Sequence, residues 1–177
     1  MDRADFSGHR ILFVGGKTHT MGLVRSILGI MGVTQILHFE ENNRALELLT
    51  IEHFHAVFLD GKAEDAEGFT VAARRRDGML NPMIPIFAVQ DRARRRDVEK
   101  ARDTGVTDVV TTPISPKAIM NKLKAAQVAP RPFIVAPEFF GPDRRAKNRA
   151  PWSGDERRVR QARKTKIDFH KGDFTPV

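Results

Sequence analysis

The sequence contains no cysteine, so it can form no disulfide bond and no thiolate metal or redox site. Its apolar runs are far shorter than the ~20 residues that a membrane-spanning helix needs. The first five residues, Met-Asp-Arg-Ala-Asp, do not follow the basic-then-apolar plan of a secretory signal. No arrangement typical of nucleophilic catalysis can be argued either. We therefore expect a soluble cytoplasmic protein that is not an enzyme and has no membrane partner.

Positive charge is concentrated in the last quarter of the chain. The 177 residues carry a formal net charge of +8. Residues 1–130 hold 18 Lys and Arg against 16 Asp and Glu, whereas residues 131–177 hold 12 against 6. A basic excess of this kind favours an interaction tail over a basic globular surface.

Short apolar runs alternate with segments of helical periodicity through residues 1–128. The apolar runs, which predict strands, lie near residues 11–14, 36–39, 56–60, 85–89 and 109–110. The periodic segments between and after them predict five helices. Strict alternation indicates a parallel α/β sheet with helices on both faces. From residue 129 onward proline and charge increase and the periodicity is lost, so we expect a basic, Pro/Arg-rich and partly disordered extension over 129–177.

Asp60 ends the third predicted strand, directly after the apolar run Ala56–Leu59. Such a run is typical of a strand that is buried on both faces. The carboxylate then lies at the carboxyl edge of the sheet, where open α/β sheets bind ligands. Asp60 is therefore either the reactive group of a site or a simple strand terminator.

Four residues at matching positions give the first 125 or so residues a resemblance to a known family. Asp60 ends the third strand, Gly68 follows eight residues later, Gly105 precedes the fifth strand and Pro113 follows it. In this spacing the chain resembles the receiver (CheY-like) domain of two-component response regulators. The resemblance implies a flavodoxin-like sheet of order 2-1-3-4-5, and it places Asp60 at the phosphoacceptor position.

The resemblance also implies a phosphorylation pocket, and most of its groups are absent. The family holds Mg²⁺ with an acidic pair that would fall at Gly15 and Gly16. Its hydroxyl would fall at Gln90 and its lysine at Thr112, so that only Pro113 matches beside Asp60. A carboxylate attacks a phosphoryl group only when the developing charge is neutralised. We therefore expect a degenerate pocket that binds no metal and no cofactor.

Two lysines leave alternatives open for Asp60. Lys17 and Lys62 stand close to the pocket in sequence, and an ammonium can replace part of a metal's charge, but without its coordination geometry. In the interpretation that we prefer, Asp60 pairs with Lys17 or Lys62 and the pocket is fixed in one state. In the alternative, the chain is an active response regulator that uses Mg²⁺ and is phosphorylated at Asp60.

The extension contains a short repeat with aromatic, glycine, acidic and arginine positions. Its first copy includes Phe139, Phe140, Arg144 and Arg145, and its second includes Trp152, Arg157 and Arg158. A disordered chain gains nothing by exposing aromatic side chains at matched points. We therefore expect these residues to bind a partner: the folded domain, a second subunit or another protein. Arginines with interleaved aromatics also suit nucleic acid, although neighbouring acids weaken that interpretation.

Together these features predict a signalling module that acts through protein–protein contacts. The expected partner is a signalling protein such as a histidine kinase or a phosphotransfer protein, and a homodimer is a further candidate. Two alternatives stay open: a single-domain response regulator in a phosphorelay, and a nucleic-acid-binding protein that uses the basic tail.

Overall fold

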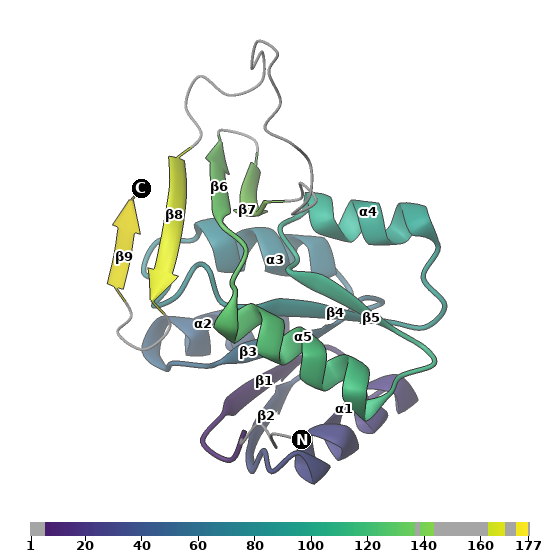
Figure 1. Cartoon of the computed structure of the whole chain (residues 1–177). Coiled ribbons are helices and arrows are strands. Elements are labelled where there is room, and N and C mark those ends of the chain that lie inside the picture. The colour runs from purple at the N-terminus through teal and green to yellow at the C-terminus, as the bar shows by residue number, and fades with distance from the viewer. Residues whose placement is uncertain (1–5, 137–138, 144–162, 169–172, 177) are drawn as a thin grey trace.

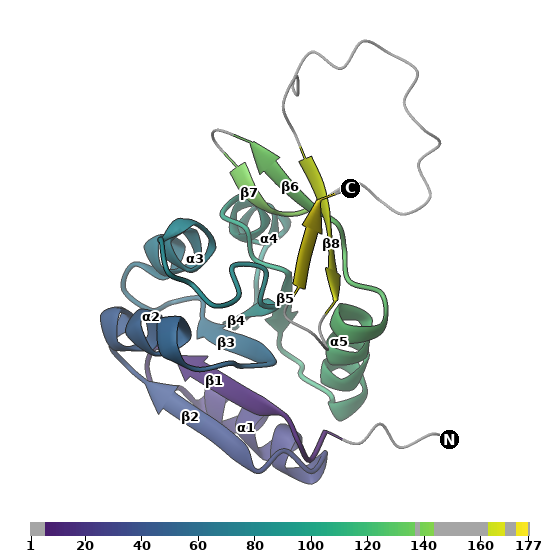
Figure 2. The same ribbon diagram turned by 90° about the vertical axis from the view of Figure 1, so that its left-hand side faces the viewer.

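The structure of the protein, a computed structural model, describes residues 6–136, 139–143, 163–168 and 173–176. Side chains are described as far as residue 143. Two sheets make up the described part, a parallel one in the first two thirds of the chain and an antiparallel one after it. Figure 1 shows them in one view and Figure 2 from the side.

The first sheet has five parallel strands in the order β2-β1-β3-β4-β5, as the resemblance implied. The strands are β1 (Arg10–Val14), β2 (Gln35–Phe39), β3 (Ala56–Asp60), β4 (Ile86–Gln90) and β5 (Asp108–Thr111). The helices are α1 (His19–Ile30), α2 (Asn42–Ile51), α3 (Ala66–Arg75), α4 (Arg95–Asp103) and α5 (Pro116–Val128). The predicted fold class is confirmed.

Alternating side chains of the strands supply a core on each face of this sheet. On β1, Ile11 and Phe13 pack with α1 and α5, whereas Leu12 and Val14 pack with α2 and α3. Every residue of β3 is buried, as its continuous apolar run predicted. This two-sided burial holds the carboxyl end of β3, and therefore Asp60, in a fixed place.

The helix α4 is the least anchored of the five. It begins at Arg95, and none of its residues is fully buried. Val98 and Ala101 are only partly buried against the core. The rest of this helix is mostly charged, so α4 makes little apolar contact with the domain.

The extension forms a second sheet that the sequence did not predict. Its antiparallel strands are β6 (Phe133–Ala136), β7 (Phe139–Pro142), β8 (Arg163–Asp168) and β9 (Asp173–Pro176), in the order β7-β6-β8-β9. Both views show β6 and β7 beside α3 and α4, remote from α1. Within the described residues, no helix is long and apolar enough to cross a bilayer.

Candidate functional site

Asp60 lies at the carboxyl end of β3 with only 5% of its surface exposed. Its Oδ1 accepts a hydrogen bond of 3.0 Å from the backbone N–H of Lys62. The carboxylate is therefore held by the turn that follows its own strand. This is the crevice in which the sequence placed it.

The turn after β1 approaches Asp60 so closely that it needs glycine. Gly15 has a φ of +108°, and a Cβ added there would lie 2.7 Å from the Cβ of Asp60. A Cβ at Gly16 would instead lie 3.8 Å from Oδ2 of Asp60, which is an ordinary contact. Of the two positions that the resemblance assigns to an acidic pair, the first is closed by geometry and the second is open.

Neither lysine forms the ion pair that we preferred for Asp60. The Nζ of Lys17 lies 3.2 Å from Oε1 of Glu40, at the end of β2, in an exposed pair. Lys62 contacts Asp60 through its backbone amide and not through its ammonium group. Within the described residues no lysine or arginine lies in ion-pair contact with Asp60, so this prediction is wrong. The two long side chains gain more by remaining in water than by following a buried carboxylate.

Gln90 and Thr112 fill the β4 and β5 side of the crevice. A Cβ at Gly61 would lie 2.4 Å from Cγ of Gln90, so the glutamine side chain covers the turn after β3. The Thr112 hydroxyl donates a hydrogen bond of 2.6 Å to Oδ1 of Asp91. This bond, with attraction from Lys62 and Arg92, holds the pKa of Asp91 below its usual range. Pro113 follows through a cis peptide bond.

The donor set of this crevice does not fit Mg²⁺. The ion needs several hard oxygen ligands in octahedral geometry. Asp60 offers one carboxylate, and the backbone at Gly15 leaves no room for a second one at that position. Within the part of the chain that the structure describes, no group of three or more His, Asp or Glu side chains could hold a metal ion.

The extension packs directly onto this domain through β6 and β7. The Phe133 side chain is buried, and its ring meets that of Phe140 edge to face at 5.9 Å. A Cβ at Gly141 would lie 2.7 Å from the Cα of Gly105, and one at Gly105 would lie 2.6 Å from the carbonyl oxygen of Phe140. The two backbones touch, so the hairpin is seated on the turn between α4 and β5.

Arg74 forms the centre of that contact, and nothing in its sequence context singled it out. Only 2% of this residue is exposed, and its guanidinium donates to the carbonyl oxygens of Gly105, Pro82 and Ile84 at 3.1, 2.7 and 2.7 Å. Burial lowers the pKa of Arg74 to about 9, which leaves it charged at neutral pH. Within the described residues no carboxylate pairs with it. Arg74 is therefore a buried structural cation of α3.

The aromatic and basic residues predicted to bind a partner fall into two groups. Phe139 and Phe140 are both partly buried in β7, against the domain rather than in solvent. The other five lie outside the described residues: Arg144, Arg145, Trp152, Arg157 and Arg158. Contact with the chain's own domain, one of the alternatives left open, is thus observed for Phe139 and Phe140.

Comparison with known proteins gives a structural answer and no sequence match. No protein-family model and no curated protein matches the chain. The solved structures that it resembles include receiver domains of response regulators and of a sensor histidine kinase, each covering about two thirds of the chain. The first two thirds of the chain has the receiver fold.

Three of these structures give the scale of the likeness. Chemotaxis response regulator CheY4 of Vibrio cholerae matches with a TM-score of 0.55 and 16% identity, over 66% of this chain and 96% of its own. The receiver domain of a sensor histidine kinase from Pseudomonas aeruginosa, with magnesium in its active-site cleft, matches with a TM-score of 0.56 and 19% identity, over 66% of this chain and 95% of its own. The receiver domain of Ssk1 from Saccharomyces cerevisiae, crystallised with the phosphotransfer protein Ypd1, matches with a TM-score of 0.54 and 16% identity, over 66% of this chain and 86% of its own.

Proposed function

We propose that this protein is a receiver-fold signalling module that acts through protein–protein contacts, without ordinary Mg²⁺-dependent phosphorylation of Asp60. One observation supports this above others: Gly15 occupies a position where any side chain would collide with Asp60. Phosphoryl transfer to a carboxylate depends on positioning and on charge neutralisation. Among the described residues, the crevice has the acceptor carboxylate, no acidic pair after β1, and no lysine or arginine in ion-pair contact with Asp60.

The comparisons support the choice of partner class. The structure of Ssk1 was solved in complex with a histidine phosphotransfer protein. The similar receiver domain from Pseudomonas aeruginosa is itself part of a sensor histidine kinase. Proteins of these two kinds, kinases and phosphotransfer proteins, are the partners that we propose, and a second copy of this chain is the alternative.

The chemistry can be tested by incubating the full chain with acetyl phosphate and Mg²⁺, followed by intact-mass measurement. A receiver with a complete acidic pair runs in parallel as the positive control. We expect no phosphoryl adduct on this chain. An adduct that disappears in Asp60→Asn would overturn the proposal and establish the alternative.

That alternative, an active response regulator phosphorylated at Asp60, has one specific observation in its favour. The carboxylate is held by the N–H of Lys62, and its Oδ2 faces the open position at Gly16. A cellular test separates the two functions. If contacts alone matter, an Asp60→Asn allele retains the wild-type phenotype while deletion of the gene changes it. If phosphorylation matters, Asp60→Asn and the deletion behave alike.

A further inference from the structure

A cavity of about 300 Å³ lies between α3 and α4, beside the Asp60 crevice, with which it shares Gly61, Lys62 and Gln90. Its floor is apolar and built from small and branched side chains, Leu59, Ala66, Ala88, Ala101 and Val106. Asp60, Gly15 and Gly16 do not line it. Its volume is at the lower end of the range for small-molecule sites.

The rim of this cavity carries both signs of charge, but its acids are already engaged. Glu67 pairs with Lys100 at 2.5 Å, across the gap between α3 and α4. Asp97 accepts the backbone N–H of Arg94 at 2.9 Å. Asp91 accepts the Thr112 hydroxyl. Each of the three therefore already has a partner within the chain.

Three groups on the Gln90 side of the rim remain available to a ligand. The Oε1 atom of Gln90 is buried and has no hydrogen-bond partner among the described residues. Lys62 and Arg92 line the same side; both attract the charge of Asp91, and within the described part of the chain neither lies in ion-pair contact with a carboxylate. A buried acceptor without a donor is unfavourable, so a ligand N–H placed there would be favoured.

The backbone at Arg92 gives a second, independent indication. Arg92 has a φ of +53°, a conformation that long side chains rarely adopt. Such strain is concentrated at functional sites, where surrounding structure enforces it. Here it occurs in the turn that brings the Arg92 side chain to the cavity rim. Because α4 makes little apolar contact with the domain, the wall of the cavity that it forms can shift when a ligand binds.

From these observations we infer that the α3–α4 cavity binds a small organic anion with a flat apolar body and an N–H donor. The body lies on the floor of Leu59, Ala88 and Val106, the donor meets Oε1 of Gln90, and the anion lies between Lys62 and Arg92. At its far end the cavity reaches Thr104 and Val106, on either side of the Gly105 contact with the hairpin. A bound anion would therefore lie next to residues that contact Asp60 at one end and next to the contact between Gly105 and the hairpin at the other.

The test is a titration of the ¹⁵N-labelled full chain with 4-aminobenzoate, followed by NMR, in a buffer with no phosphodonor and no Mg²⁺. We expect saturable shifts at Gly61, Thr104 and Val106, with a dissociation constant in the millimolar range for so small a probe. Two further probes remove one feature each: 4-aminobenzamide lacks the charge and benzoate lacks the donor. Both should bind at least about threefold more weakly.

Variants of the full chain locate the site. Lys62→Gln and Arg92→Gln should each raise the dissociation constant about fivefold, as loss of a charged contact predicts. Ala101→Leu should abolish binding by filling the cavity, and the two exposed charge variants still decide the question if that chain does not fold. Lys117→Gln, an exposed lysine on α5, is the matched control and should change nothing. The inference is overturned if no saturable shift appears at these amides. It is equally overturned if the neutral amide, or both charge variants, bind as well as the original pair.

Discussion

The guanidinium carbon of Arg74 lies 5.2 Å from the centre of the Phe133 ring. The cation comes from α3 and the ring from β6, so a helix of the receiver fold and a strand of the extension share one buried contact. Cation–π contacts of this kind are worth more when desolvated. Phe133 therefore ties strand β6 of the extension to the buried side of α3.

Replacing Arg74 with Met should lower the free energy of unfolding by about 2–4 kcal/mol, because three buried carbonyl oxygens lose a charged donor. Denaturant unfolding of the full chain measures this. Arg25→Met removes an exposed arginine on α1 and should change stability by less than about 0.5 kcal/mol. Equal, small effects for both variants would show that Arg74 does not hold the extension in place.

The contact between Gly105 and Gly141 predicts a second, steric effect. Gly141→Ala should destabilise the protein by about 1–3 kcal/mol, because its Cβ would lie 2.7 Å from another backbone atom. Gly29→Ala, in open space on α1, should instead stabilise it by about 0.5–1 kcal/mol. Thermal unfolding of the two variants gives opposite shifts in Tm if the hairpin is seated as described. A neutral Gly141→Ala would contradict that seating.

Carboxylates introduced at the two glycines after β1 should behave differently. Gly16→Asp should fold normally, because its Cβ meets Asp60 only at 3.8 Å. Gly15→Asp should lose about 2 kcal/mol or more, from the left-handed backbone and from collision with a buried residue. Thermal unfolding at pH 7 compares the two. Similar Tm values would mean that the turn can move away from Asp60.

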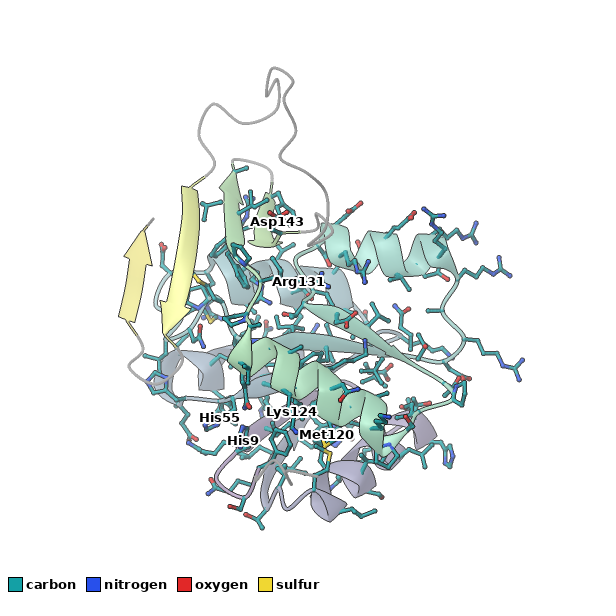
Figure 3. The ribbon with its side chains drawn as sticks, in the orientation of Figure 1. His9, His55, Met120, Lys124, Arg131 and Asp143 are labelled. Carbon is teal, nitrogen blue, oxygen red and sulfur yellow. The ribbon has the colours of Figure 1, made fainter. Side chains whose placement is uncertain are left out.

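The folded state should lose stability in mild acid through His55. Its Nδ1 accepts the N–H of Arg10 at 3.1 Å, and burial, with the nearby His9, lowers the pKa of His55. Figure 3 shows the two histidines side by side below α5. Glu52, which pairs with Arg10, and the nearby His53 complete the charged surroundings.

The sign of this dependence follows from proton binding. Below the ordinary histidine pKa of about 6.5 the unfolded chain binds a proton at His55 more readily than the folded chain does. The free energy of unfolding should therefore fall as the pH falls through that value, and it should be fully retained above it. His55→Asn should flatten this slope in unfolding curves taken from pH 5 to pH 8, and His53→Asn, which removes no contact with Arg10, should not. A slope unchanged in His55→Asn would rule out this assignment.

The sequence was sufficient for the parallel sheet, because that part of the fold depends on apolar periodicity. The run Ala56–Leu59 followed by Asp60 placed the third strand within its observed bounds. The sequence defines the ends of α4 poorly, because a helix with so few apolar residues has a weak apolar periodicity. The departures from the family at Gly15 and Gln90 were also readable from the sequence, because they are single positions in a known spacing.

The extension could not be predicted in the same way. Strand β6 has only four residues, and its burial depends on a partner 59 positions earlier, Arg74, for Phe133. Contacts between residues so far apart leave no local pattern. The same reason hid the cavity between α3 and α4, whose lining comes from two strands, two helices and three turns. The ion pair predicted for Asp60 is the opposite kind of error. Lys17 and Lys62 lie close in sequence to residues of the crevice, but in the folded chain neither pairs with Asp60.

Gly15 also limits which sequences the turn after β1 can accept during evolution. Substitutions arise one at a time, and the first one at this position would carry a folding penalty before any benefit. Placing an acid there requires that the β1 turn first be rebuilt around Asp60. The form of the crevice therefore depends more on its backbone than on its side chains, and adding an acid at Gly15 would need several coordinated changes.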